Sequence, residues 1–339
     1  MKLPSVSVVF LSYKQERFVE EALRAALAQD LPEFELIIAD DASPDGTWAV
    51  IDRVLAEPLR PGIRVKTLRQ PKNLGILGNF NAALAMASGE VFVLMAGDDV
   101  SYPSRVRKMA EAFAGDPSLR AVSCASRVVD ANGLPISSRA PDLRTQTFEH
   151  GVGRKDPYAG APVTGACAAY HRSLHETFGP LPPDAGGEDV DSIFRALLLG
   201  RVQYYGEVLL DYRQHGGNIC NFSADAVTDE ELAHLEIWAS ECNAQFDRQW
   251  FRDLDLAVKL GFVDPKRERH IHSLIERHAG RHALSALSLK ASPFSEWWPA
   301  ARRLLKRGDL VKVLKLLLLR VFEFRRKAHW DWVKRRKGR

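Results

Sequence analysis

Short apolar runs alternate with amphipathic stretches over the first 130 residues of the chain. The runs are continuous rather than interrupted by polar residues, which is typical of strands buried on both faces. Between them, apolar residues recur with the spacing of a helix that covers a core. We expect strands at Val6–Leu11, Leu36–Ala39, Val65–Leu68, Val91–Ala96 and Ala121–Val129, and helices at Arg17–Gln29, Thr47–Leu55, Asn79–Ala87 and Ser104–Phe113. This repetition predicts the α/β class, with a Rossmann-like, mostly parallel central sheet flanked by helices.

A second α/β portion follows residues 131–165, which are rich in Pro, Gly and Ser. Its pattern predicts a strand near Cys167–His171, a helix at Asp189–Leu199, and strands near Val202–Glu207 and Leu209–Gln214. Beyond about residue 224 the periodicity is helical throughout. We therefore divide the chain into an α/β domain at 1–222, with halves at 1–130 and 131–222, and a helical C-terminal region at 223–339.

Two histidines in the helical region have the spacing of a metal site. His278 and His282 lie four residues apart, as zinc ligands do on a helix. Arg277 and Arg281 stand beside them, and their positive charge disfavours a bound cation. We expect a solvated basic face here.

The composition is that of a folded globular protein. Of 339 residues, 46% are hydrophobic and 27% are charged, which excludes disordered and collagen-like chains. The four cysteines are scattered without a CxxC pair, so we expect neither a zinc ribbon nor a disulfide framework, and a reducing cytoplasm fits best. No uncharged apolar run reaches the roughly 18 residues of a membrane span. The first apolar run predicts a strand rather than a signal peptide.

Positive charge is concentrated at the C-terminal end. Residues 301–339 hold 15 Lys or Arg and three Asp or Glu, a net charge of +12, whereas the first 300 residues carry a net of −8. An amphipathic helix is expected within this tail, from Leu310, Val313, Leu314, Leu317, Leu318, Val321 and Phe322, with Trp330 and Trp332 beyond it. Basic and aromatic residues together favour an anionic membrane surface. The alternative is a helix packed on the domain, and nucleic acid is not an expected partner because no binding module is recognisable.

Acidic residues follow two of the expected strands. Asp40 and Asp41 come directly after the second strand, and Asp98 and Asp99 come after the fourth. Ligands of parallel sheets bind beyond the carboxyl ends of the strands, so these carboxylates should meet in one crevice. A divalent cation would relieve their repulsion, and phosphate oxygens of a nucleotide could complete its ligands. The alternative for the first motif is turn and helix-cap chemistry.

Three other classes of nucleotide site are disfavoured. No GxGxxG follows the first strand, and no GxxxxGK[ST] loop is present, which argues against dinucleotide-dependent dehydrogenases and P-loop enzymes. The first strand also lacks the glycine-rich loop of a nucleotidyltransferase that makes nucleotide sugars. Without such a loop, a metal ion must manage the charge of a diphosphate.

Six motifs occur in a characteristic order. They are Val6–Tyr13, Glu35–Thr47, Asn73–Ile76, Gly97–Asp99, Thr164–Cys167 and Gly187–Asp189. As an ordered set they resemble a family 2 glycosyltransferase with the GT-A fold, of the inverting and non-processive kind, over roughly residues 4–220. The resemblance implies that residues 1–130 bind the nucleotide and that residues 131–222 carry the acceptor and catalytic side.

The resemblance also implies roles for single residues. Tyr13 would stack on the nucleobase and Asp41 would accept a hydrogen bond from it, as expected for uracil. The remaining nucleotide-binding residues would be Leu11, Ser12, Asn79 and Asp98. Asp99 would ligate Mg²⁺ or Mn²⁺, although Ala96 stands where many members have an acidic residue.

The catalytic base implied by the resemblance is Asp189, which would take the proton of the acceptor hydroxyl. Its alternative role is that of a helix cap. Gly165, Ala166 and Glu188 would lie near the donor and acceptor sugars. His215 would ligate the metal or touch a phosphate, or else be a hydrogen-bonded structural histidine.

The resemblance therefore implies a metal-dependent transfer of a sugar from a nucleotide-diphosphate donor, most simply a UDP-sugar. The acceptor would be a hydroxyl of a saccharide or lipid-linked saccharide in cell-surface polysaccharide synthesis, in the cytoplasm or at the inner membrane face. One alternative is a GT-A protein that binds nucleotide or glycan without turnover. A nucleotide-sugar pyrophosphorylase is a further, weaker alternative.

Overall fold

The computed structural model describes residues 2–136, 144–149, 164–218 and 229–289, together with the single residues 295, 298, 299, 301, 302, 305 and 313. Within these residues, nine strands form one sheet in the order β3-β2-β1-β4-β8-β6-β9-β5, with β7 paired to β9. The strands are β1 (Val6–Ser12), β2 (Phe34–Asp40), β3 (Ile63–Arg69), β4 (Val91–Ala96), β5 (Val100–Ser101), β6 (Leu119–Val129), β7 (Gln146–Glu149), β8 (Ala168–His171) and β9 (Arg201–Arg213). The predicted α/β class is confirmed.

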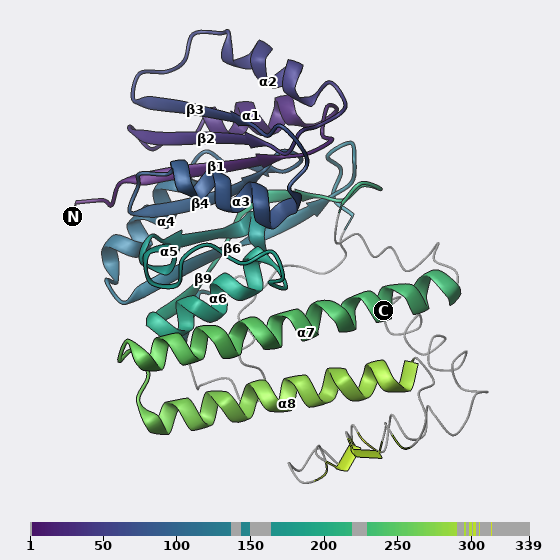
Figure 1. The fold of residues 1–339 in the computed structure, drawn as a ribbon. Helices are drawn as coiled ribbons and strands as arrows, with labels where there is room; N and C mark the ends of the chain where they lie inside the picture. The colour runs from purple at the N-terminus through teal and green to yellow at the C-terminus, as the bar shows by residue number, and fades with distance from the viewer. Residues whose placement is uncertain are drawn as a thin grey trace.

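Helices cover both faces of this sheet (Figure 1). They are α1 (Val19–Leu27), α2 (Thr47–Leu55), α3 (Gly75–Met86), α4 (Arg105–Gly115), α5 (Ser173–Phe178), α6 (Glu188–Leu199), α7 (Asp229–Lys259) and α8 (Pro265–Leu289), with a 3₁₀ turn η1 (Gly165–Cys167). One core lies between the sheet and α1, α2 and α4, and a second lies between the sheet and α3, α5 and α6. Val8 and Phe10 enter the first core and Val9 enters the second, because side chains alternate between the faces of a strand.

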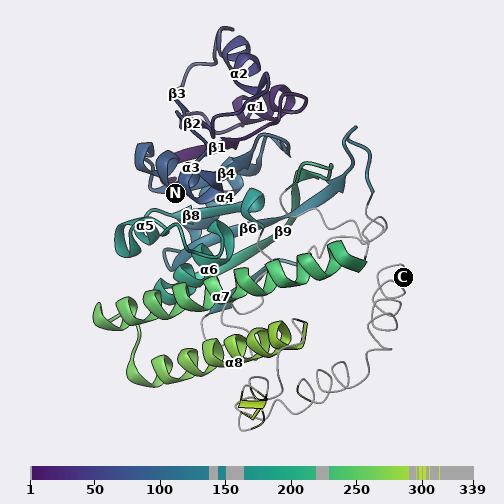
Figure 2. The ribbon, with the colours of Figure 1, turned by 45° about the vertical axis from the view of Figure 1, so that its right-hand side comes forward.

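A third core joins the C-terminal helices to the α/β domain. Phe194 and Leu198 of α6 pack against Trp250 and Leu254 of α7 and against Ile275 of α8. The two long helices run side by side below α6, as both views show (Figures 1 and 2). Helix α6 is therefore covered on both sides, by the sheet and by α7.

The sheet departs from the sequence expectation in three respects. The sheet is mixed rather than mostly parallel, because β8 is antiparallel to both of its neighbours, β4 and β6, and β5 and β7 are antiparallel to β9. Strand β3 is at the edge of the sheet and is partly exposed, so the expected burial of Val65–Leu68 on both faces is wrong. The two strands expected over residues 202–214 are one strand, β9, whose register against β6 slips near Cys124 and Ala125.

The histidine prediction is wrong for His278. Its side chain is buried, its Nδ1 lies 2.7 Å from Oδ1 of Asp247, and its ring lies 5.0 Å from that of Trp250. The side chain of His278, which was expected to face solvent, therefore packs between α7 and α8.

Most of the predicted cationic tail lies outside the described residues, as does the domain boundary placed at residue 222. Over the part of the chain that is described, no helix is long and apolar enough to cross a membrane. Cys124, Cys167 and Cys242 are free thiols.

Candidate active site

The polar ends of β1, β2 and β4 lie at one edge of the sheet. Ser12 of β1 pairs with Asp40 of β2, and Leu11 pairs with Ala96 of β4, in parallel register. The carbonyl of Leu11 then accepts the N–H of Gly97 at 2.9 Å. The segments that begin at Asp40 and Gly97 therefore start at the same level, on either side of β1.

Of the two carboxylates after β2, Asp40 shapes the turn. It is fully buried and accepts hydrogen bonds from Ser12 Oγ at 3.1 Å and from Ser43 Oγ at 2.5 Å. Ala42, between the two acidic residues and Ser43, has a φ of 57°, so the chain reverses sharply here. The turn chemistry weighed for this motif thus belongs to Asp40 and to Asp45, whose Oδ1 accepts the N–H of Thr47 at 3.2 Å, whereas the carboxylate of Asp41 bonds to Leu74 instead.

Asp41 is buried beside exposed apolar side chains. Its Oδ1 accepts the N–H of Leu74 at 2.7 Å, and its own N–H donates to the carbonyl of Ser12 at 3.0 Å. Burial raises its pKa, although the N–H groups of Leu74 and Gly75 oppose the shift. Tyr13, Leu74 and Ile76 are 38%, 39% and 41% exposed. A buried acceptor among exposed apolar groups suits a flat, aromatic ligand with N–H donors.

Asn79 lies in the protein interior at the same edge. Its side chain is 3% exposed. Its Nδ2 donates to the carbonyl of Ala39 at 2.9 Å, and its Oδ1 accepts from Gln70 Nε2 at 3.2 Å. These bonds hold the end of β2, so Asn79 supports the Asp41 turn from within.

Asp98 and Asp99 are held by the last residue of β9. The backbone N–H of Arg213 donates to Asp99 Oδ1 at 2.8 Å, and its Nε donates to the carbonyl of Asp98 at 2.8 Å. The buried guanidinium also pairs with Glu21 of α1 at 2.6 Å and lies over the ring of Phe18, 5.1 Å from its centroid. No role of its own was predicted for Arg213 from the sequence.

The second oxygen of Asp99 is buried and has no hydrogen-bond partner. Burial, and then the charge of Asp98, raise the pKa of Asp99 well above its ordinary value. A divalent cation would satisfy both the oxygen and the charge, so the residue fits the metal role that the sequence predicted. Among the described residues, however, no three His, Cys, Asp or Glu side chains are grouped as ligands. A cation here would take most of its ligands from phosphate and water.

His215 contacts Asp98 directly. Its Nε2 lies 3.1 Å from Asp98 Oδ2, and its Nδ1 accepts the N–H of Gly217 at 3.1 Å. Because Nδ1 is an acceptor, the proton of the neutral ring is assigned to Nε2, which donates it to Asp98. Both ring nitrogens are therefore engaged, and His215 could bind a cation only after the bond to Asp98 opens.

Glu188 and Asp189 begin α6 and pack against η1. A Cβ on Gly165 would lie 2.7 Å from Glu188 Oε1 and 3.6 Å from the Cβ of Asp189, so a larger residue at Gly165 would require the Glu188 side chain to move. Asp189 Oδ1 accepts the N–H of Val190 at 2.7 Å. Burial raises the pKa of Asp189, and burial together with the charge of Asp189 raises the pKa of Glu188 to about 8. Such a raised carboxyl suits a general base.

Arg105 connects η1 to the end of β4. This fully buried side chain donates from one nitrogen to the carbonyls of Leu94 at 2.9 Å and Ala166 at 2.7 Å. Its charge also acts on Asp99, where it opposes the rise in pKa. Asp41, Asp99 and Asp189 therefore follow one another along the same edge, and we call these three the carboxylate row. Arg105 was expected only as part of a helix.

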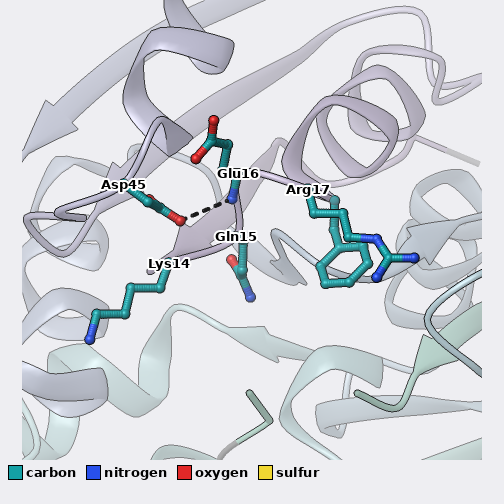
Figure 3. Close-up of a pocket in the computed structure, with 6 residues that line it drawn as sticks. Lys14, Gln15, Glu16, Arg17 and Asp45 are labelled. Carbon is teal, nitrogen blue, oxygen red and sulfur yellow. Dashed lines mark hydrogen bonds between the residues drawn. The ribbon is translucent and has the colours of Figure 1, made fainter. Parts of the chain in front are cut away.

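A solvent-open hollow of about 520 Å³ lies in the loop that follows Tyr13. Figure 3 shows its lining, in which Lys14 and Arg17 point away from each other and Asp45 accepts the N–H of Glu16 at 3.3 Å. Arg17 also donates to Asn132 Oδ1 at 2.7 Å. The hollow is lined mainly by polar groups.

Sequence comparisons place these features among known proteins. The profile of the family described as Glycosyl transferase family 2 matches residues 7–179, about half of the chain. An uncharacterized glycosyltransferase of Nostoc sp. is 26% identical over 262 residues, which are 76% of this chain and 77% of the relative. In several other curated relatives the match covers less than two thirds of the relative's length, between 32% and 62%.

Two solved structures share the fold. The mannosyltransferase PcManGT from Pyrobaculum calidifontis, in complex with GDP-Man and Mn²⁺, is similar over 95% of this chain and 88% of its own, with a TM-score of 0.56 and 20% identity. TarS from S. aureus, in complex with UDP-GlcNAc, is similar over 90% of this chain and 92% of its own, with a TM-score of 0.53 and 17% identity. At these identities the likeness is one of fold.

Proposed function

This chain belongs to glycosyl transferase family 2, and we propose that its carboxylate row moves a sugar, with inversion, from a nucleotide-diphosphate donor to a hydroxyl acceptor. The observation that carries the proposal is the continuity of the row. Asp41 lies beside exposed apolar groups, Asp99 has a buried unpartnered oxygen, and Asp189 is a partly buried carboxyl with a raised pKa, all at one edge of the sheet.

The chemistry needs one proton acceptor. The acceptor oxygen attacks the anomeric carbon, its proton passes to a carboxylate oxygen of Asp189, and the bond from that carbon to the donor phosphate breaks with its electron pair on the diphosphate. A bound Mg²⁺ or Mn²⁺, held by Asp99, would neutralise charge on the departing diphosphate. The backbone N–H of Arg213 holds Asp99 in place, and we propose that His215, which contacts Asp98, lies beside the same phosphates.

We propose a uracil nucleotide as the donor. Asp41 offers a buried acceptor for a base N–H, Tyr13 and Ile76 offer exposed apolar faces, and the backbone of Leu11 and Ser12 ends at the same level. The two structural neighbours contain GDP-Man and UDP-GlcNAc, so the fold accommodates both purine and pyrimidine donors. The sugar would then lie between Asp98 and the Gly165–Ala166 turn, next to Glu188.

We propose a saccharide or lipid-linked saccharide as the acceptor, used in cell-surface polysaccharide synthesis. The support is the net charge of +12 over residues 301–339, which would hold the protein at the anionic inner face of a membrane. A site working at that surface would meet acceptors carried on lipid.

A panel of nucleotide sugars tests the function. The chain is incubated with UDP-, GDP- and dTDP-sugars, with Mn²⁺, Mg²⁺ or EDTA, and both thermal shift and release of nucleoside diphosphate are measured. We expect one donor class to raise the melting temperature in the presence of metal, because a ligand that binds the native state stabilises it by mass action, and we expect the same donor to be turned over. Binding without turnover by any acceptor would favour the non-catalytic alternative.

Tyr13 carries a further prediction. Tyr13→Ala should weaken binding of the nucleoside diphosphate by about 1–3 kcal/mol, the range measured for base–aromatic stacking, or roughly 5- to 150-fold in Kd. Isothermal titration measures the change. Phe262→Ala removes another exposed ring, at the turn between α7 and α8, and serves as the matched control. Equal affinities for the two variants would contradict the stacking role.

A further inference from the structure

Helix α7 grips the loop that leads into α6. Arg252 of α7 pairs with Asp184 through two bonds of 2.8 and 3.0 Å. Asp253 of α7 pairs with Arg195 of α6 at 2.8 and 3.1 Å, and both of these side chains are buried. Arg195 also donates to the carbonyl of Gly179 at 2.9 Å. The loop between Gly179 and α6 is thus tied to α7 directly at Asp184, and at Gly179 through Arg195.

The closest contact lies immediately before Glu188 and Asp189. A Cβ on Gly186 would lie 2.2 Å from Cδ1 of Phe246 and 2.5 Å from its Cε1, so the ring of Phe246 rests directly on this glycine. At Gly187 the corresponding distance to Phe246 Cε1 is 3.6 Å. No side chain larger than a hydrogen fits between α7 and the loop at Gly186.

The ring of Phe246 is itself held in place. It stacks on Trp250, with centroids 5.8 Å apart and planes 20° apart. Trp250 stacks in turn on Phe194 of α6, at 5.3 Å and 26°. Since Trp250 and Phe194 are fully buried, Phe246 is part of a rigid aromatic stack between α7 and α6.

Asp191 holds the same loop from the other direction. This buried residue lies on the first turn of α6, and its Oδ2 accepts the N–H groups of Gly186 at 3.0 Å and Gly187 at 3.3 Å. The two glycines are therefore clamped between a ring of α7 and a carboxylate of α6. Asp189 lies two residues beyond them, and its carboxylate accepts the N–H groups of Val190 and of Gly165 in η1.

We propose that Phe246 is a positioning residue for Asp189, and that α7 is thereby part of the active-site architecture. The inference rests on the proposed role of Asp189 as the base. Contact of the Phe246 ring with Gly186 and Gly187 holds the N-terminal end of α6 against η1. A base displaced by about 1 Å can lose 10²-fold in rate, so a fixed loop matters for proton transfer.

Gly186→Ala and Phe246→Ala, singly and together, test the proposal in the full chain. Each single variant should lower kcat roughly 10- to 100-fold and leave the KM for the donor nearly unchanged, because Asp41 and Asp99 are held by other contacts. The double variant should be no slower than Gly186→Ala alone, since the added methyl group then meets no ring. Phe251→Ala, which removes a ring facing His272 of α8, and Gly115→Ala, which has open space around it, are the controls.

Hydrogen exchange gives a readout that does not depend on turnover. The amides of Gly186 and Gly187 should exchange faster in Phe246→Ala than in the wild type and in Phe251→Ala, because the clamp is opened on one side. Unchanged exchange at these amides, or wild-type kcat in both single variants while Asp189→Asn is inactive, would overturn the inference. A wild type that turns over no donor would instead overturn the proposed function, and the exchange experiment would still decide whether Phe246 clamps the loop.

Discussion

Asp189→Asn should lower kcat by about 10²- to 10⁴-fold, the usual contribution of a general base, and leave the Kd for the nucleoside diphosphate unchanged. The amide has nearly the shape of the carboxylate and still accepts the N–H of Val190 through its oxygen, but it cannot take a proton. Steady-state kinetics and isothermal titration measure the two quantities. Asp255→Asn, an exposed substitution on α7, is the control for loss of one negative charge.

The pH dependence of the wild type extends this prediction. Burial raises the pKa of Asp189 above 3.8. The base works only when ionised, so kcat should fall as the pH decreases through this raised pKa, at a higher pH than for an ordinary aspartate. The remaining activity of Asp189→Asn should lack this acidic limb. An Asp189→Asn variant that keeps more than a tenth of wild-type kcat would exclude the residue as the base.

Asp99→Asn should remove the dependence of donor binding on metal. A cation held by Asp99 supplies several kcal/mol of charge stabilisation, so we expect the loss of at least about 10²-fold in kcat/KM and a Kd for the nucleoside diphosphate that Mn²⁺ no longer improves. Titration with and without Mn²⁺, and binding of Mn²⁺ itself followed by electron paramagnetic resonance, measure the effect. Asp52→Asn on the exposed side of α2 is the matched control.

The same variant separates metal binding from folding. Burial raises the pKa of Asp99 in the native state, so the native state loses stability as the pH rises from the pKa of an unfolded aspartate up to this raised pKa. The amide introduced by Asp99→Asn carries no charge, and without metal the variant should melt no lower than the wild type. Persistence of the Mn²⁺ effect in Asp99→Asn would show that the cation is held elsewhere.

The alternation of strands and helices was predictable because strands that are buried in a sheet appear in the sequence as continuous apolar runs. Val8, Val9 and Phe10 are all apolar, although they face different cores. The acidic turns at Asp41 and Asp99 come directly after apolar runs of this kind and can be recognised for that reason. The antiparallel direction of β8 leaves no such trace, since a short buried strand has the same composition in either direction.

The charged residues that organise the site were harder to predict. Arg105 and Arg213 resemble solvated arginines in the sequence, and only tertiary contacts bury them beside Asp99. His278 was misjudged for the same reason, because its partner Asp247 is 31 residues away on another helix. Asp189 and Asp191 lie on the same turn of α6 and cannot be told apart from the sequence. The structure shows that Asp191 bonds to the two glycines and that Asp189 packs against η1.

The contacts of Arg213 limit how this enzyme could be divided into fragments that fold and bind a donor. A fragment ending near residue 130 would keep Asp98 and Asp99 but lose the β9 amide that bonds Asp99 and the guanidinium that bonds the Asp98 carbonyl and Glu21. Two separately expressed halves would therefore need to reassemble across β6 and β9 before either could bind a donor. A circularly permuted chain, in which Arg213 of β9 can still pair with Glu21 of α1, should therefore fold better than a truncated chain.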